Sequence, residues 1–430
     1  MLLTLLVLLL FVLIFLGMEI SWAIAVACLG YLFAAELMDV GQPLVLIPQT
    51  FLVGIDSFSL LAVPLFIFAG ELMTETGVTR RLIRFAASLV GHIRGGLANV
   101  GVVTNFIMAG ISGSAIADAA AIGTVLIPQM QERRYPLRFS CAVIAASSTV
   151  GPIIPPSISF VLLGAIANLS VGRLFLGGVV PGAIMSFAMF ALTYYISRKR
   201  GYPVEVRADW NEKLAALLTA ILPLLAPVIV ICAMVFGVAT PTEAAAILVL
   251  FVLFLGLIVY RSLSLRMLLR CASNAAMVSA IVMITVGAAQ VFSVLSIYEE
   301  FGHILTGAML AMSDNVYVLL LMLNIVLLLL GIFMEPLPLM LVMAPIAFPM
   351  FSEMGVDPIH LGVVMVINII LGLITPPVGL VLSVVGVIGR IDPMELFWEI
   401  LPYKITLILV LLLLTYWPAL TTWLPTMLMG

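Results

Sequence analysis

The sequence predicts an all-α polytopic membrane protein with two inverted repeats, each holding a re-entrant helical hairpin and a broken helix. Three observations predict this fold: an apolar composition, the placement of a few charges, and an internal repeat. Of the 430 residues, 64% are hydrophobic and 9% are charged, whereas a soluble domain is about a quarter charged. At about 20 residues per helical span, the chain has room for on the order of ten membrane-embedded segments. A net charge of -3 gives no polybasic face, which excludes a nucleic-acid partner.

The first apolar run lacks a positively charged start and a small-residue cleavage site, so we expect a retained membrane segment broken at Gly17 and Glu19. Further on, the basic residues form four groups. Short basic loops stay in the cytoplasm, so these groups mark one side of the membrane. The groups are Arg80, Arg81, Arg84 and Arg94; Arg133, Arg134 and Arg138; residues 198–213; and Arg261, Arg266 and Arg270. Between them, residues 139–197 and 214–260 each have room for two spans.

The first predicted hairpin covers about residues 97–132. Basic groups frame it on both sides, yet its 36 residues are short of the ~40 that two spans require. It should therefore enter the membrane and turn back near Gly110 to Ser114, and such a turn is tolerated only where it is buried or lines a wet cavity. Asp118 is an acid inside this hairpin. A carboxylate at that depth costs roughly 3 kcal/mol or more, so it either acts in function or bonds the hairpin's own backbone amides.

A shift of 221 residues superposes the two halves of the chain. It brings Gly151–Pro156 onto Gly372–Pro377 and Gly110 onto Gly331. The second half has a candidate hairpin at about 315–350, framed by acids where the first is framed by bases, as an inverted repeat would produce. Each hairpin is followed by an apolar segment that the Pro-Pro motif interrupts, at about 140–168 and 360–389. Unwound helices of this kind hold ions and anionic groups in membrane proteins, although two kinked structural helices are the alternative.

Several small and hydroxyl-bearing residues lie at the predicted turns and breaks. Neutral oxygens from Ser112 and Ser114, with Gly113 between them, suit a monovalent cation better than Ca2+; tight helix packing is the other interpretation. Hydroxyls at the breaks either face the site or bond the preceding turn. Glu335 lies at the second turn, where a solvated outward-facing acid is the alternative. The hydroxyls in question are those of Ser147, Ser148 and Thr375.

Motifs for chemistry are missing from the sequence. It contains no P-loop, HExxH, GxSxG or Cys/His cluster, so we expect neither an enzyme nor a pump that hydrolyses ATP. His92, His303 and His360 have no partners at metal-ligand spacing and are interpreted as residues of the membrane interface.

The string GISGSAIADAAAIGTVLIPQM from Gly110, followed by GPIIPPS, TPTEAA and GLITPPVG, resembles the large membrane subunit of tripartite ATP-independent periplasmic (TRAP) transporters. The resemblance runs over nearly the whole chain. It implies an elevator-type transporter of the bacterial inner membrane that takes up a carboxylate-bearing solute, such as a C4-dicarboxylate or sugar acid, on a sodium gradient. It also implies two partners, a periplasmic substrate-binding protein and a small four-helix membrane subunit, here expected as a separate chain.

Carried onto this sequence, the resemblance implies two Na+ sites with the substrate between the hairpin tips. The first site would involve Ser112, Gly113, Ser114, Ser148 and Val150, and the second Gly331, Gly372, Thr375 and Val378. Substrate or transport roles are expected for Asp118, Ser147, Pro155, Pro156, Glu335, Pro376 and Pro377. No organic cofactor is expected.

The expected division places scaffold helices at 1–56 and 183–277, transport-domain repeats at 57–182 and 278–402, and a C-terminal helix at 403–430. Two other functions remain open. One is a stand-alone ion-coupled carboxylate transporter of related hairpin architecture, which would need no partner. The other is an intramembrane enzyme for lipid-linked substrates, which would need clustered His, Asp or Glu at loop ends.

Overall fold

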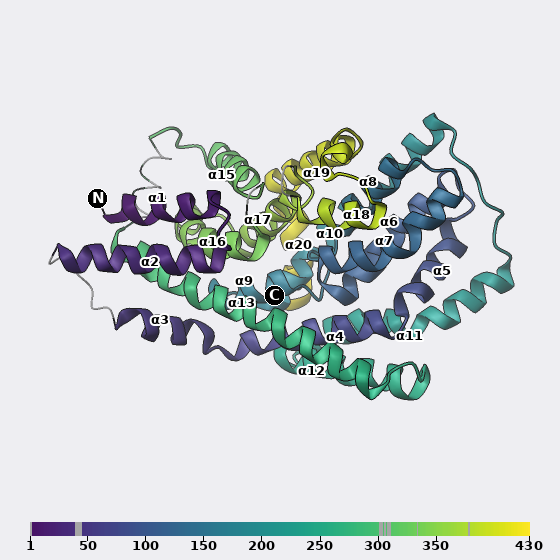
Figure 1. The fold of residues 1–430 in the computed structure, drawn as a ribbon, viewed down its shortest axis with the longest axis horizontal. Helices are drawn as coiled ribbons and strands as arrows, with labels where there is room; N and C mark the ends of the chain where they lie inside the picture. The colour runs from purple at the N-terminus through teal and green to yellow at the C-terminus, as the bar shows by residue number, and fades with distance from the viewer. Residues whose placement is uncertain are drawn as a thin grey trace.

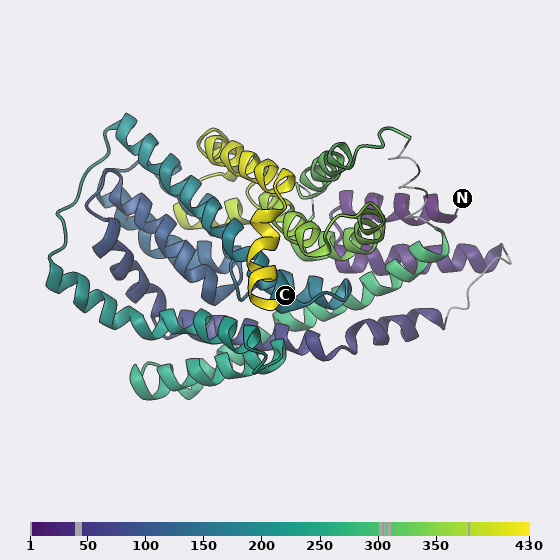
Figure 2. The ribbon, with the colours of Figure 1, turned by 180° about the vertical axis from the view of Figure 1, so that it is seen from behind.

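A computed structural model describes residues 2–38, 45–300, 304, 307, 311–332, 334–376 and 379–430. Within these ranges the regular structure is entirely helical (Figures 1 and 2). Seven of the described helices are long and apolar enough to cross a membrane, and shorter apolar helices accompany them. The predicted all-α polytopic class is therefore confirmed.

The N-terminal part begins with two antiparallel helices, α1 and α2, and continues through α3, η1, α4 and α5 to the first hairpin. α1 and α2 pack on each other, and the turn between them includes Gly17 at φ +84°, where the sequence predicts a break. The elements are α1 (Leu2–Phe15), α2 (Ile20–Leu37), α3 (Leu46–Ile55), the 3-10 helix η1 (Phe58–Leu61), α4 (Ala62–Glu75) and α5 (Val78–Val90).

The first repeat follows with the predicted hairpin and broken helix. Two hairpin arms pack on each other, and both pack on the first half of the broken helix. The elements are α6 (Gly96–Ser112) and α7 (Ala115–Glu132) for the hairpin, α8 (Leu137–Ser148) and α9 (Ile158–Ile166) for the broken helix, and the long α10 (Val171–Arg200).

The central helices are α11 (Trp210–Val235), α12 (Pro241–Phe254), the π-helix η2 (Leu255–Val259) and α13 (Leu265–Tyr298). The start of α12 is a capping box: the Glu243 backbone N–H donates to the Thr240 hydroxyl at 3.4 Å, and the Glu243 carboxylate accepts from the Thr240 backbone N–H at 2.8 Å. Pro241 occupies the first helical position, where no N–H is needed. The turn between the two spans predicted for residues 214–260 thus ends at Thr240.

The second repeat has the same order of elements as the first, a hairpin followed by a broken helix and a long helix. Its elements are α15 (Val316–Leu330) and α16 (Pro336–Glu353), α17 (Pro358–Gly372) and α18 (Leu380–Gly389), then η3 (Pro393–Leu396), α19 (Phe397–Tyr416) and α20 (Ala419–Met429). Adding 221 to the limits of α7, 115 and 132, gives 336 and 353, which are the limits of α16. The start of α8 maps onto the start of α17 in the same way, from 137 to 358. The register found in the sequence therefore describes real helices.

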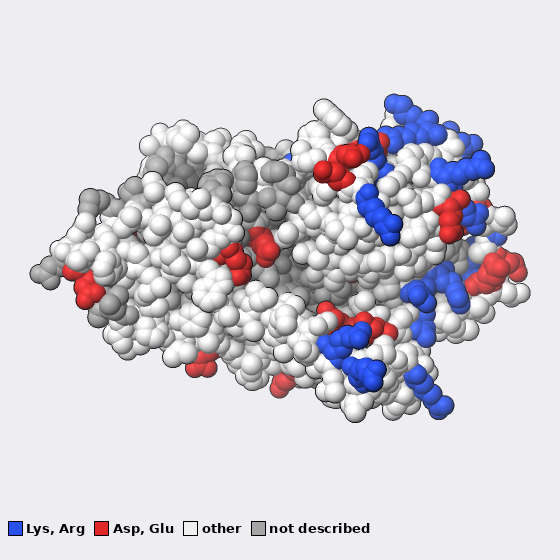
Figure 3. Space-filling view, in the orientation of Figure 1, with Lys and Arg blue, Asp and Glu red and all other residues white. Residues whose placement is uncertain are grey.

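The two repeats exchange their packing partners. α7 packs against α18 of the other repeat, and its counterpart α16 packs against α9; likewise α8 contacts α19 while α17 contacts α10. The hairpins occupy opposite halves of the molecule, α6 and α7 in one and α15 and α16 in the other (Figure 1). On the face in Figure 3, Lys and Arg gather over the half that holds α5 to α8, whereas the other half carries a few acids among uncharged residues. This is the inverted arrangement that the charges predict.

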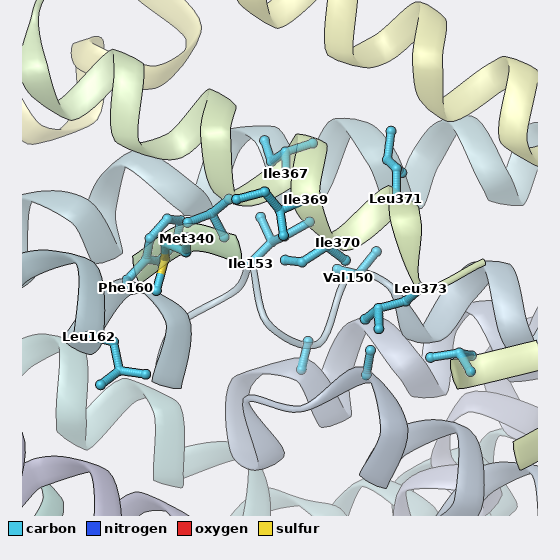
Figure 4. Packing of buried hydrophobic residues seen from close by; sticks show 14 of the residues in the cluster. Val150, Ile153, Phe160, Leu162, Met340, Ile367, Ile369, Ile370, Leu371 and Leu373 are labelled. Carbon is cyan, nitrogen blue, oxygen red and sulfur yellow. The ribbon is translucent and has the colours of Figure 1, made fainter. Parts of the chain in front are cut away.

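The interior is formed where the repeats meet. In Figure 4, Val150 and Ile153 of the first break point toward Ile370 of α17, and Phe160 of α9 lies beside Met340 of α16. These side chains are almost fully buried. The predicted division into moving and static parts stays a prediction, and three of its limits (182/183, 277/278 and 402/403) fall inside the continuous helices α10, α13 and α19.

Candidate functional site

The tip of the first hairpin rests directly on the first break. Gly113 has a left-handed backbone at φ +60°, and a Cβ there would lie 2.7 Å from the Pro156 carbonyl oxygen, so only glycine fits. Ser114 caps α7 by accepting the Ala117 N–H at 3.4 Å. Gly110 is also close to the first break, because a Cβ on Gly110 would lie 3.5 Å from the Pro155 carbonyl oxygen.

Asp118 is fully buried behind this tip. Neither of its carboxylate oxygens has a hydrogen-bond partner among the described residues, so the structure offers no support for its bonding the hairpin's own amides. A Cβ on Gly151 would lie 2.7 Å from Asp118 Oδ2 and 3.1 Å from the Ser148 carbonyl oxygen. A buried charge without a partner is costly. The nearby groups are carboxylate and carbonyl oxygens, which are the ligands that hard cations prefer. The residues present therefore fit a small monovalent cation.

The hydroxyls at both breaks bond the helix turn before them. Ser148 donates to the Ala145 carbonyl at 3.0 Å, and Thr375 donates to the Leu371 carbonyl at 2.9 Å. A hydroxyl that donates its hydrogen keeps its lone pairs, so these contacts leave a cation-ligand role open. Ser147 likewise donates to the Val143 carbonyl at 2.7 Å, and it also accepts from the Asn105 amide at 2.6 Å, which joins α6 to α8.

The second tip and the second break meet backbone to backbone. A Cβ on Gly372 would overlap the Gly331 carbonyl and lie 2.8 Å from the Gly331 Cα. Gly331 and Gly372 are thus brought together, as the family resemblance implies. Thr375 is buried and Pro376 half-buried nearby, whereas Pro377 and Val378 lie outside the described residues.

A buried amide ties the second hairpin to its broken helix, as Asn105 does in the first. The Asn368 amide donates to the Asn324 side-chain oxygen at 2.8 Å and to its backbone carbonyl at 3.0 Å. Asn368 is the repeat equivalent of Ser147, 221 residues later. In both repeats the first hairpin arm, α6 or α15, is therefore fixed to the residue that lies four positions before the glycine of the Pro-Pro motif, Gly151 or Gly372.

The interpretation of His360 as an interfacial residue is wrong, because it is 1% exposed. Its ring nitrogens pair with the Thr421 hydroxyl at 2.8 Å and the Thr415 carbonyl at 3.2 Å. The Thr415 hydroxyl in turn accepts from Asn324 at 2.9 Å. His360 thus belongs to a network that binds α15, α17, α19 and α20 together. His303 lies outside the described residues.

A cavity of about 710 Å3 lies where both tips and both breaks converge. Four helices begin at its wall: α7 after Ser114, α9 at Ile158, α16 after Glu335 and α18 after Gly379. Helix N-termini carry unpaired N–H groups and partial positive charge, so this wall favours an anionic group. Gly331 and Gly372 line it as well.

The opposite wall was not foreseen from the sequence. It comes from α13 and from the turn between α1 and α2, including Glu19 and Ser21. The Ser21 hydroxyl donates to Glu19 at 2.9 Å and shares a 2.6 Å hydrogen bond with Thr285 of α13. The break at Gly17 and the isolated acid at Glu19 were the available signals. Among the described residues of the cavity lining, Glu19 and Glu335 are the two ionisable side chains, and none is Lys, Arg or His.

The predicted site residues therefore fall into two places. Ser114, Glu335, Gly331 and Gly372 line the central cavity. The others lie behind it, in the packed contacts of a tip with a break or, for Ser147, between two helices. Those outside the cavity lining are Ser112, Gly113, Asp118, Ser147, Ser148, Val150, Pro155, Pro156, Thr375 and Pro376. Their roles in binding stay predictions.

Comparison with known proteins gives consistent matches. Residues 7–420 match the family "Tripartite ATP-independent periplasmic transporter, DctM component". The chain is 38% identical over 97% of both chains to the sialic acid TRAP transporter large permease protein SiaM of Vibrio cholerae. It is 35% identical over 96% of both chains to the C4-dicarboxylate TRAP transporter large permease protein DctM of Rhodobacter capsulatus. The crystal structure of the Alcanivorax borkumensis YdaH transporter is similar in fold, with a TM-score of 0.59 over 86% of this chain and 87% of that one, at 16% identity.

Proposed function

Since the chain belongs to the DctM family of tripartite ATP-independent periplasmic transporters, we propose that it takes up a carboxylate-bearing solute together with Na+. The chain is a transport protein of the inner membrane and not an enzyme. In the proposal, a periplasmic binding protein delivers the solute, and a small four-helix membrane subunit completes the permease. Two of the relatives are named for the carboxylates sialic acid and C4-dicarboxylate, which supports a carboxylate as the recognised group.

The observation that carries the substrate class is the wall of four helix N-termini around one cavity. Free backbone N–H groups can hydrogen-bond a carboxylate without any basic side chain. A volume of about 710 Å3 is in the range of ligand pockets, about 300–1,000 Å3. The cavity would therefore hold a small organic acid between the two hairpin tips.

The charges around the cavity support cation coupling. Glu19 and Glu335 face it, and Asp118 lies buried behind the first tip. None of the described lining residues is basic and able to balance an anionic solute, and like charges repel strongly where the effective dielectric constant is low. Bound Na+ at the tip-break contacts would supply the missing positive charge. A carboxylate would then enter only in company with cations, which is the basis of symport.

The two candidate cation sites differ in charge. Position 339, the repeat equivalent of Asp118, is a leucine. In the proposal the first site therefore holds Na+ with its own counter-charge, whereas the second depends on carbonyl and hydroxyl oxygens and on the charge of the solute. Movement of the two repeats past the N-terminal and central scaffold helices, in an elevator manner, would carry the loaded cavity across the membrane.

The test is thermal unfolding of the purified chain in choline chloride as NaCl replaces it. We expect Na+ to raise the melting temperature of the wild type and of Glu132→Gln, which removes an exposed acid from the same helix, but to have little effect on Asp118→Asn. KCl should not substitute for NaCl. Equal responses of all three proteins to Na+ would remove the argument for the first site.

Transport decides between the tripartite proposal and the stand-alone carboxylate transporter. Proteoliposomes with the chain, its small subunit and its binding protein should accumulate the binding protein's ligand only with an inward Na+ gradient. Uptake of the same ligand by the chain alone would favour the stand-alone alternative. Uptake that is indifferent to Na+ would exclude the coupling.

A further inference from the structure

A second cavity lies at the joint between α4 and α5, and it shares no lining residue with the central one. Its volume is about 450 Å3, and Thr76, Gly77 and Thr219 form part of its wall. The rest of the lining consists of three arginines, Arg80, Arg81 and Arg84. None of the described residues that line it is an acid.

The three arginines lie on one side of α5. Its other side, with Leu82, Ile83 and Ala86, is buried in the protein. Like charges three and four residues apart on a helix repel one another, so the cluster is unfavourable without a counter-charge. The ion pairs found among the described residues are Arg133–Glu205, Arg138–Glu395 and Arg200–Glu399, and none of them involves α5.

The cavity is organised before any ligand arrives. The Arg81 guanidinium lies 3.6 Å from the centre of the Tyr260 ring and donates to the Thr76 carbonyl at 3.1 Å. These two contacts fix its direction. Gly77 precedes α5 with a left-handed backbone at φ +74°, and no side chain caps this 13-residue helix. Its first-turn N–H groups therefore add positive potential at the same end.

The position of the cavity indicates which class of anion can reach it. The candidate span Phe58–Glu75 ends immediately before it, and its arginines are the first of the four basic groups that mark the cytoplasmic side. On α11, Leu218 and Ile221, within one turn of Thr219, are 62% and 44% exposed, as lipid-facing residues are. The cavity thus joins a basic lining to an apolar membrane-facing surface. An anionic phospholipid complements both, because its phosphate is negatively charged and its acyl chains are apolar.

We propose that this cavity binds the headgroup phosphate of an anionic phospholipid of the cytoplasmic leaflet. The guanidinium groups of Arg80, Arg81 and Arg84 donate hydrogen bonds to the phosphate oxygens, and the acyl chains lie along α11. Because α5 connects α4 to the first hairpin arm α6, a lipid bound here fixes the joint through which that hairpin is attached. The proposal does not depend on the transported solute or on Na+.

Lipid binding to the delipidated, purified full-length chain tests this proposal, measured by native mass spectrometry with dioleoyl phosphatidylglycerol and dioleoyl phosphatidylcholine. The wild type should bind phosphatidylglycerol about tenfold more tightly than phosphatidylcholine. The double variant Arg80→Gln/Arg84→Gln should lose most of that preference while keeping the wild-type melting temperature, because both side chains are exposed and Arg81 retains its stacking.

The control is Arg266→Gln/Arg270→Gln on α13, which removes two exposed arginines with the same four-residue spacing from the same side of the membrane. It should bind phosphatidylglycerol as the wild type does. Equal losses in the two double variants would show a general surface attraction and overturn the site. Absence of headgroup preference in the wild type would do the same. Inorganic phosphate that displaces the lipid at low millimolar concentration would indicate a free-anion site instead.

Discussion

Replacing Gly372 by alanine tests the backbone contact between the second hairpin tip and the second broken helix. The added Cβ would overlap the Gly331 carbonyl oxygen and lie 2.6 Å from its carbon and 2.8 Å from the Gly331 Cα. Carbon atoms in contact are normally about 3.5–4.0 Å apart. The two backbones must therefore separate by about 1 Å, and no side-chain rotation relieves the clash.

Overpacking of this kind costs about 1–3 kcal/mol, so we expect Gly372→Ala to melt a few degrees below the wild type. The functional loss should be larger. Oxygen ligands hold a hard cation within a few tenths of an ångström, and a displacement of about 1 Å can reduce activity by on the order of a hundredfold. Na+-driven uptake in proteoliposomes should fall accordingly.

Gly307→Ala is the matched control, since a Cβ there meets nothing within 4 Å. It should behave as the wild type in both measurements, or be slightly more stable. A Gly372→Ala protein with wild-type melting temperature and wild-type uptake would refute the inference that the two backbones must touch.

Three further substitutions test the packing around the site. Asn368→Leu removes both hydrogen bonds to Asn324 and leaves a buried amide oxygen without a donor, so thermal unfolding should reveal a loss of about 1–3 kcal/mol; an unchanged melting temperature would mean that the network is not structural. Phe160→Ala empties a fully buried position and should cost about 3–5 kcal/mol, measured in the same way, with Phe187→Ala on the exposed surface as its comparison. Glu399→Gln breaks the partly exposed pair with Arg200 at 2.9 Å and should cost less than about 1 kcal/mol; a larger drop would show that this pair is more than a surface contact.

Those parts of the fold that depend on local chemistry could be predicted from the sequence. Clustered glycine and proline favour turns and helix breaks, so the turn at Ser112–Ser114 and the break after Ser148 were found to within a few residues. Single prolines are weaker signals, since Pro128 and Pro181 lie inside the continuous helices α7 and α10. Asp118 stood out because a single acid in an apolar run is expensive. The repeat supplied the same information twice.

The other wall of the central cavity could not be predicted in this way. Glu19 and Glu335 line the same cavity although 316 residues of sequence separate them. Composition does not distinguish a helix face that contacts protein from one that contacts lipid. The burial of His360 was missed for a related reason: its partners Thr415 and Thr421 are 55 and 61 residues away. Hydroxyls in apolar segments give no indication of which distant polar group they serve.

The exchange of packing partners between the repeats sets an order in time for the assembly of the protein. α7 leaves the ribosome long before α18, which begins 248 residues after α7 ends. At a synthesis rate of about 5–20 residues per second, this interval lasts roughly 12 to 50 seconds. During it, the helix that carries Asp118 has no partner on that face. Burial of this face of α7 is therefore a late step in biogenesis, and in a nascent chain arrested before α18 it should remain accessible to proteases and membrane quality control.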